Sequence, residues 1–145
     1  MYKKIMVPTD GSKKSELAVQ QGIQLAGVLK AVVVVLHVIP EIPTLVTPYP
    51  DQPGGFLSGL SEELDRSGEE ILEKAKDKYA DSGVDFQTKL LRGSAAHEIC
   101  NEAKKGQYDL IVMASRGMGE IQGYLMGSVS NRVVRRAGCS VLIIR

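Results

Sequence analysis

Several residue types are scarce in this sequence of 145 residues, which contains no tryptophan, two phenylalanines and two cysteines. Cys100 and Cys139 stand 39 positions apart, and neither belongs to a CxxC pair. Only His37 and His97 are present to complete a ligand set, so the spacing does not indicate a structural zinc site. We therefore expect no protein-bound metal and two reduced, buried thiols.

The sequence also lacks an excess of charge of one sign and lacks a long hydrophobic run. Its 18 basic and 17 acidic residues give a formal net charge of +1, which excludes the strongly basic surface typical of proteins that bind nucleic acid or anionic membranes. The longest apolar run, at 31–36, is too short to span a bilayer, and the first residues contain no signal-peptide core. These features predict a cytoplasmic protein with no nucleic-acid or membrane partner.

Short apolar runs alternate along the chain with segments of helical periodicity. The expected strands are rich in β-branched residues and comprise 3–8, 31–38, 84–91, 109–114 and 140–145. The expected helices place apolar residues on one face and comprise 12–29, 61–80, 94–105 and 123–137. Five prolines and three glycines make 39–60 an expected long, mobile loop. The alternation predicts one doubly wound α/β domain over residues 1–145, with a parallel sheet and helices on both faces.

Two loops at the ends of expected strands have the composition of a ligand site. In doubly wound sheets, ligands bind beyond the carboxyl ends of the strands where the winding reverses, which would bring 8–12 ("PTDGS") close to 114–119 ("ASRGMG"). Gly117 and Gly119 would expose backbone N–H groups in a nest for anions. If a helix starts at Gly127-Ser128, its N–H groups and dipole favour phosphate, and the hydroxyls of Ser128 and Ser130 add donors.

Each of these features also has a purely structural interpretation. Glycine is common in strand-to-helix turns, and Gly127 could lie inside the last helix and allow it to pack closely on the sheet. Asp10 could simply cap the first helix, and Arg116 could be a solvated loop residue rather than a phosphate ligand. The Walker sequence GxxxxGK[ST] and the dinucleotide sequence GxGxxG are both absent.

Taken together, these stretches resemble the nucleotide-binding branch of the universal stress protein family. The resemblance covers almost the whole chain, from "KKIMVPTDGS" through "LHVI", "DLIVMASRG" and "GSVSNRVV" to "CSVLIIR". The family motif is glycine, two residues, glycine, nine residues, glycine, then serine or threonine. Gly117 and Gly127-Ser128 match it across the gap 118–126, whereas Ala114 replaces the first glycine. Alanine is harmless there if φ is negative and costly if φ is positive.

The resemblance implies a sheet order of 3-2-1-4-5, a homodimer and an adenine-nucleotide site. Strand five, with Val141, Leu142, Ile143 and Ile144, would lie at the sheet edge and pair with a second copy. ATP, or another adenine nucleotide with Mg²⁺ or Mn²⁺, is the expected ligand. Asp10 and the Val38 backbone would meet adenine or ribose, with Met113 and Ala114 along the ribose. Phosphates would lie against Gly117, Gly127, Ser128 and Val129. The complete expected site comprises Pro8, Thr9, Asp10, Val38, Met113, Ala114, Ser115, Arg116, Gly117, Met118, Gly119, Gly127, Ser128, Val129 and Ser130.

Three functions compete on this evidence. The leading hypothesis is an ATP-binding regulatory or stress-response module without efficient catalysis. The alternative is a slow ATP hydrolase or phosphotransferase, but such a catalyst needs a group that orients the nucleophile, and His37 is expected to be packed within strand two. A two-component receiver domain would need an acidic pair after strand one and an aspartate after strand three. The chain has only Asp10 at the first place and "LLRGS" at the second, which excludes that class.

Overall fold

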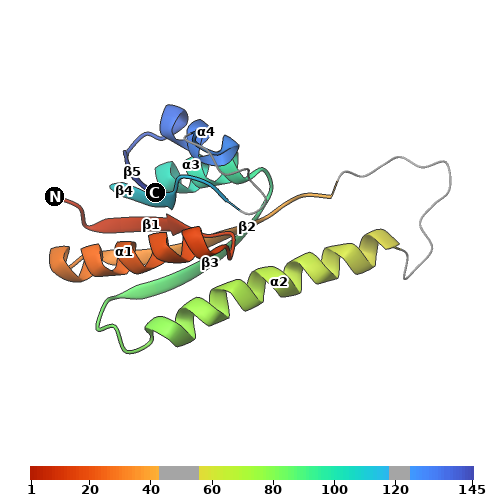
Figure 1. Ribbon diagram of the computed structural model, residues 1–145, viewed down its shortest axis with the longest axis horizontal. Helices are drawn as coiled ribbons and strands as arrows, with labels where there is room; N and C mark the ends of the chain where they lie inside the picture. Colours follow the sequence, from red (N-terminus) through yellow and green to blue (C-terminus); the bar gives the residue numbers. More distant parts are fainter. Residues whose placement is uncertain (43–55, 118–124) are drawn as a thin grey trace.

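The fold was obtained as a computed structural model that describes residues 1–42, 56–117 and 125–145. Helices and strands alternate along the chain (Figure 1). In chain order the elements are β1 (Lys4–Pro8), α1 (Lys13–Leu29), β2 (Val32–Ile39), α2 (Phe56–Tyr79), β3 (Phe86–Arg92), α3 (Ala95–Lys105), β4 (Leu110–Ala114), α4 (Ser128–Arg136) and β5 (Ser140–Ile144).

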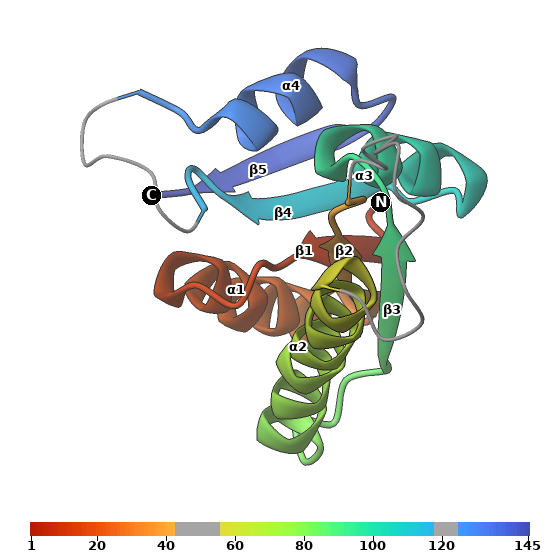
Figure 2. The same ribbon diagram turned by 90° about the vertical axis from the view of Figure 1, so that its right-hand side faces the viewer.

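The five strands form one parallel sheet in the order β3-β2-β1-β4-β5. Helices α1 and α2 cover one face of the sheet, and α3 and α4 cover the other (Figure 2). This arrangement confirms the predicted α/β class, the strand order and the doubly wound plan. β1 lies at the centre, because the chain first winds outward to β2 and β3 and then returns to β4 on the other side of β1.

The hydrophobic core is divided in two by the sheet. Alternate residues of a strand point to opposite faces, so Ile5 and Val7 pack beneath α1 and α2 while Met6 packs beneath α3 and α4. Val35 and Leu36 of β2 divide in the same way. These side chains are fully buried, as the continuous apolar runs of β1 and β2 predict for strands covered on both faces.

Three predicted element boundaries were wrong. The loop predicted over 39–60 is shorter at both ends, because Ile39 belongs to β2 and α2 already begins at Phe56. The last proline of that stretch is Pro53, so nothing after it blocks helix formation, and Gly59 is accommodated at a cost of about 1 kcal/mol. The helix predicted from residue 123 begins at Ser128, because Gly127 has an extended ψ of 162°. Residues 43–55 and 118–124 lie outside the described part of the chain.

Both cysteines are free, as expected for reduced thiols, but the expectation that they are buried was wrong. Each is half-buried, because it packs at the margin of the core beneath α3 and α4. Burial raises the pKa of Cys100 and of Cys139. Across the described residues, no helix has the length and apolar character needed to cross a membrane. The cytoplasmic location stays a prediction.

Asp109, directly before β4, is hydrogen-bonded to the backbone at the start of β1. This contact should make the free energy of unfolding depend on pH in the acid range. Asp109 Oδ2 accepts hydrogen bonds from the backbone N–H groups of Lys3 at 2.8 Å and Lys4 at 2.9 Å, which lower the pKa of the Asp109 carboxyl. A lowered folded-state pKa contributes stability above the unfolded-state pKa, and this contribution is lost as the pH falls through the folded-state pKa.

We therefore expect Asp109→Asn to reduce stability at neutral pH and to weaken its decline on acidification. The free energy of unfolding measured by urea titration between neutral and acid pH checks this. Asp81→Asn, which removes one exposed negative charge elsewhere, is the control. A wild type and an Asp109→Asn variant with parallel acid profiles would contradict the assignment.

Candidate functional site

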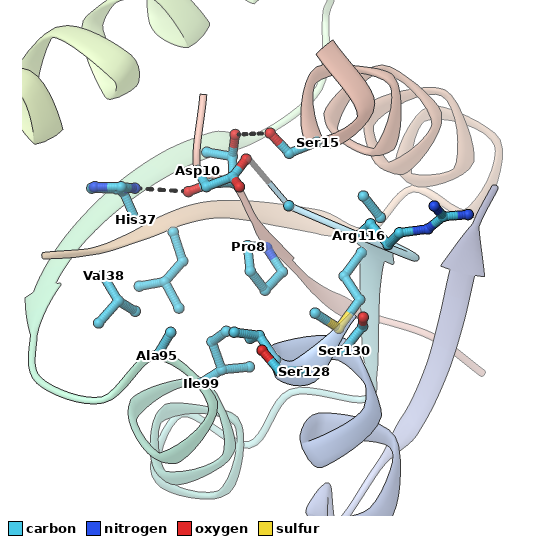
Figure 3. Close-up of a pocket in the computed structure, with 16 residues that line it drawn as sticks. Pro8, Asp10, Ser15, His37, Val38, Ala95, Ile99, Arg116, Ser128 and Ser130 are labelled. Atoms are coloured by element: carbon cyan, nitrogen blue, oxygen red, sulfur yellow. Dashed lines mark hydrogen bonds between the residues drawn. The ribbon is translucent and has the colours of Figure 1, made fainter. Parts of the chain in front are cut away.

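A cavity of about 310 Å³ opens at the carboxyl ends of β1, β2 and β4 (Figure 3). The switch point of the winding lies here, because the chain leaves β1 toward β2 on one side while β4 flanks β1 on the other. Residues of α1, α3 and α4 complete the walls. The cavity is lined by Pro8, Thr9, Asp10, Ser15, Leu36, His37, Val38, Ala95, Ile99, Met113, Ala114, Arg116, Gly117, Ser128, Val129 and Ser130.

The loop after β1 is held by hydrogen bonds of its own short polar side chains. Thr9 N–H donates to the Leu36 carbonyl at 2.8 Å, and the Thr9 hydroxyl lies 2.9 Å from that of Ser15. Asp10 Oδ1 accepts from Ser12 N–H at 3.0 Å, so this carboxylate supports the turn that leads into α1. Gly11 has a φ of +80°, which explains the glycine at this turn. Ser12 then caps α1, accepting from Ser15 N–H at 3.2 Å.

His37 connects the end of β2 to this loop. Its Nδ1 lies 2.8 Å from the Thr9 carbonyl, and because a carbonyl only accepts, Nδ1 must be the protonated nitrogen. α2 packs against the imidazole through Gly68, where an added Cβ would lie 3.0 Å from His37 Cδ2. The expectation that His37 is a packed residue therefore agrees with its contacts, although its side chain also lines the cavity.

The two glycine-containing segments of the predicted motif are joined through the carbonyl of Ser115. Gly127 N–H donates to this carbonyl at 2.8 Å, and the Ser130 hydroxyl donates to it at 2.6 Å. Ser130 is 2% exposed and Ser115 is 7% exposed, so these bonds are shielded from water. The start of α4 is thereby fixed directly beyond the end of β4, with Gly127 as its N-cap residue. Of the two positions considered for Gly127, the helix start is the observed one.

Asp10 and Gly117 are in close contact across the mouth of the cavity. A Cβ added to Gly117 would lie 2.5 Å from Asp10 Oδ2, which is closer than real Cβ atoms approach a heavy atom. Arg116 is half-buried beside Gly117 and extends away from the centre of the cavity in Figure 3. The absence of a side chain at Gly117 therefore determines where the Asp10 carboxylate lies.

We expect Gly117→Ala to weaken ligand binding without unfolding the protein. The new methyl group would displace the Asp10 carboxylate, which is the end of a short movable side chain, so stability should change by about 1 kcal/mol or less. Loss of one charge-assisted contact to a ligand corresponds to roughly tenfold in affinity. Calorimetric titration checks this, with Gly138→Ala as the control because an added Cβ there meets nothing within 4 Å. Equal ligand affinities in Gly117→Ala and Gly138→Ala would show that the position of the Asp10 carboxylate does not affect binding.

The cavity brings together eleven of the fifteen residues predicted from the sequence. These are Pro8, Thr9, Asp10, Val38, Met113, Ala114, Arg116, Gly117, Ser128, Val129 and Ser130. Ser115 and Gly127 are not among the lining residues and instead form the backbone link described above. Met118 and Gly119 lie outside the described residues. Ala114 does not have a positive φ, so alanine is accommodated at the first motif position without backbone strain.

Five lining residues were not predicted: Ser15, Leu36, His37, Ala95 and Ile99. Ala95 and Ile99 come from the first turns of α3, which approaches the cavity because the helix after β3 returns across the sheet. Sequence spacing alone cannot show that return, but the predicted topology places the start of every helix at the carboxyl edge of the sheet. That signal would have identified Ser15, Ala95 and Ile99.

The lining of the cavity combines apolar and polar groups. Pro8, Val38, Ala95 and Ile99 provide apolar surface, and Ser128 and Ser130 add hydroxyls at the start of α4, where Ser128 lies next to Ile99 (Figure 3). The helix start adds backbone N–H groups and the positive end of the helix dipole. This arrangement suits a ligand with a flat apolar part and an anionic group.

Comparison with known proteins assigns the family. The model of the universal stress protein family matches residues 1–145, and the chain is 36% identical over 148 residues to universal stress protein YxiE of Bacillus subtilis (strain 168), covering all of both chains. The chain belongs to the universal stress protein family.

Solved structures agree with this assignment. The universal stress protein UspA from Lactobacillus plantarum superposes with a TM-score of 0.83 at 25% identity, covering 99% of this chain and 98% of that one. A universal stress protein solved in complex with cAMP superposes with a TM-score of 0.75 at 25% identity, covering 99% and 97%.

Proposed function

We propose that this protein is a regulatory or stress-response module that binds an adenine nucleotide in the cavity at the ends of β1 and β4. ATP is the nucleotide that we propose first. The observation on which this rests is the junction of the loop after β1 with the start of α4 around one cavity of about 310 Å³. Cavities of this size bind small molecules in other proteins. The related protein in complex with cAMP supports adenine nucleotides as the ligand class.

The walls suggest how the nucleotide would lie. Adenine would pack on the apolar surface, against Val38 and Ile99, and the ribose would lie beside Asp10, Met113 and Ala114. The phosphates would meet the start of α4 at Ser128 and Val129, directly after Gly127, and the backbone at Gly117. Because the Ser130 hydroxyl donates to the Ser115 carbonyl, we assign Ser130 to holding this turn. We assign Ser128 to the phosphates because it is the first residue of α4 and lines the cavity.

Mg²⁺ or Mn²⁺ would enter with the phosphates. Mg²⁺ is commonly held by one or two carboxylates together with substrate phosphates, and Asp10 is the carboxylate among the described lining residues. Within the described part of the chain there is no cluster of three or more histidine, cysteine, aspartate or glutamate side chains that could hold a metal. A metal held by the nucleotide fits this donor set better than a resident one.

Binding without efficient turnover is the form of the proposal that the contacts support. Asp10 Oδ1 accepts from the Ser12 backbone, and His37 Nδ1 is engaged by the Thr9 carbonyl. Neither contact directs a general base at the phosphate end of the cavity. A slow ATP hydrolase remains the alternative function.

Titration of the purified protein with Mg-ATP tests the proposal. We expect heat of binding at one site per chain, and free ligand at about 100 times Kd should raise the free energy of unfolding by about 2.7 kcal/mol. GTP at the same concentration is the control for recognition of the adenine base by the apolar surface with Val38 and Ile99. No heat with millimolar Mg-ATP would remove the proposed function.

We also propose a homodimer through β5. β5 is an edge strand with four consecutive apolar residues, and an unprotected edge of this kind pairs readily with another strand. Next to it a groove of about 450 Å³ runs between β5 and α1, lined by Leu142, Leu17, Val28 and neighbouring residues. These three side chains are 41%, 40% and 82% exposed. Antiparallel pairing of two copies would cover both edges and satisfy two-fold symmetry.

A further inference from the structure

A further hollow, of about 370 Å³, lies on the outer side of α4. It is lined by Ser128, Asn131, Arg132, Arg135 and Arg136, and we call it the arginine groove. All three arginines are exposed, and none forms an ion pair with a side chain in the part of the chain that the structure describes. α4 itself contains no acidic residue, so positive charge gathers here although the whole chain has a net charge of only +1.

A structural role in α4 explains two of these three arginines but not Arg132. Arg135 and Arg136 lie in the last turn of α4, where cations interact favourably with the negative end of the helix dipole. Arg132 lies in the middle of the helix, three and four residues before the other two, where like charges repel each other. A bound polyanion would remove this repulsion, because guanidinium groups bind phosphate oxygens through two parallel hydrogen bonds.

The arginine groove and the proposed nucleotide cavity share one lining residue, Ser128. Arg132 follows Ser128 by one helical turn, which is about 6 Å along the axis. A phosphate chain that leaves the cavity at Ser128 therefore reaches Arg132 first and then Arg135. The groove is polar, and it begins where the proposed ligand ends, which favours an extension of that ligand over a separate partner.

We propose that the preferred ligand is an adenine nucleotide whose phosphate chain is longer than that of ATP and extends from Ser128 into the arginine groove. Both adenosine 5′-tetraphosphate and a dinucleoside polyphosphate have this chemistry. The inference rests on the proposed function, since the adenosine end must occupy the cavity between β1 and β4. Arg132 and Arg135 then select for phosphate-chain length, because they are assigned to the phosphates that follow the one held at Ser128.

Calorimetric titration with ATP, adenosine 5′-tetraphosphate and diadenosine tetraphosphate tests the inference. We expect the nucleotides with four phosphates to bind about tenfold more tightly than ATP, because they would form new charge-assisted contacts. This preference should become smaller at high salt. The double variant Arg132→Gln/Arg135→Gln should lose the tenfold preference and keep the ATP affinity within about twofold, since these groups are assigned to the longer chain only. Lys105→Gln, an exposed cation at the far end of α3, should behave as the wild type.

The outcomes separate the inference from the proposed function. Absence of binding by ATP and by both longer nucleotides removes both. ATP binding with no added affinity for the tetraphosphates, or a preference that survives in the double variant, overturns the inference alone. Diadenosine tetraphosphate binding more tightly than adenosine 5′-tetraphosphate identifies the dinucleotide as the source, and the reverse order identifies the mononucleotide. Poly-glutamate that binds the wild type and not the double variant, without displacement by adenosine 5′-tetraphosphate, would assign the groove to an acidic protein and overturn the inference.

Discussion

Replacing Gly127 by valine should abolish nucleotide binding while the protein remains folded. Gly127 is the N-cap residue of α4 and is buried, with φ −63° and ψ 162°, angles that a residue with a side chain can also adopt. A branched side chain here would occupy the space that a phosphate needs to reach the helix start. Loss of the hydrogen bonds to this charged group should weaken binding at least about 100-fold, since each is worth about 1.5–3 kcal/mol.

The Gly127→Val variant should lose folding stability but remain folded. Valine is a poorer N-cap residue than glycine and adds a branched side chain at a buried position, so we expect a loss of about 1–3 kcal/mol and a lower unfolding temperature. Calorimetric titration with Mg-ATP, together with thermal unfolding of the free variant, separates the two effects. Gly127→Ala, which adds one methyl group, should bind with intermediate affinity. A folded Gly127→Val variant with wild-type affinity would leave Gly127 a packing role only.

The second large effect concerns the proposed dimer, which Ile143→Pro should convert to a monomer. The Ile144 carbonyl accepts from Ser115 N–H at 2.8 Å, which shows that Ile144 faces β4. Since neighbouring residues of a strand direct their backbone groups to opposite sides, Ile143 directs its N–H to the free edge of β5. Proline removes this donor from the ladder between two copies and leaves the ladder between β4 and β5 in place.

Light scattering at micromolar concentration measures the outcome. The wild type should have twice the 15.7 kDa mass of one chain, and Ile143→Pro should approach 15.7 kDa. Ile143→Val keeps the N–H group and a branched side chain, so it should remain dimeric. Ile143 is half-buried, and proline at this position should cost about 1 kcal/mol of folding stability, which circular dichroism can follow. A wild type that is monomeric at this concentration would rule out the dimer.

Much of the fold could be predicted from the sequence because the relevant physics is local. The apolar runs in β1, β2 and β4 are buried on both faces, so they show no alternation and are recognisable without knowledge of their neighbours. Ser12 precedes a long apolar periodicity and caps α1, at the start of the helix predicted over 12–29. The boundaries of α2 and α4 were misplaced, because glycine is tolerated at Gly59 within a helix and excluded from the helix at Gly127, and local composition does not distinguish the two.

The sequence by itself determined the alternation of strands and helices, the family motif and the two loops that meet at the carboxyl edge of the sheet. Only the tertiary structure decided which residues of those loops line the cavity. It engages the Ser130 hydroxyl with the Ser115 carbonyl, sets Gly117 against Asp10, and brings Ala95 and Ile99 of α3 into the apolar wall. Side-chain direction and contacts between distant segments depend on how the helices pack across the sheet. That packing cannot be predicted from the spacing of residues along the chain.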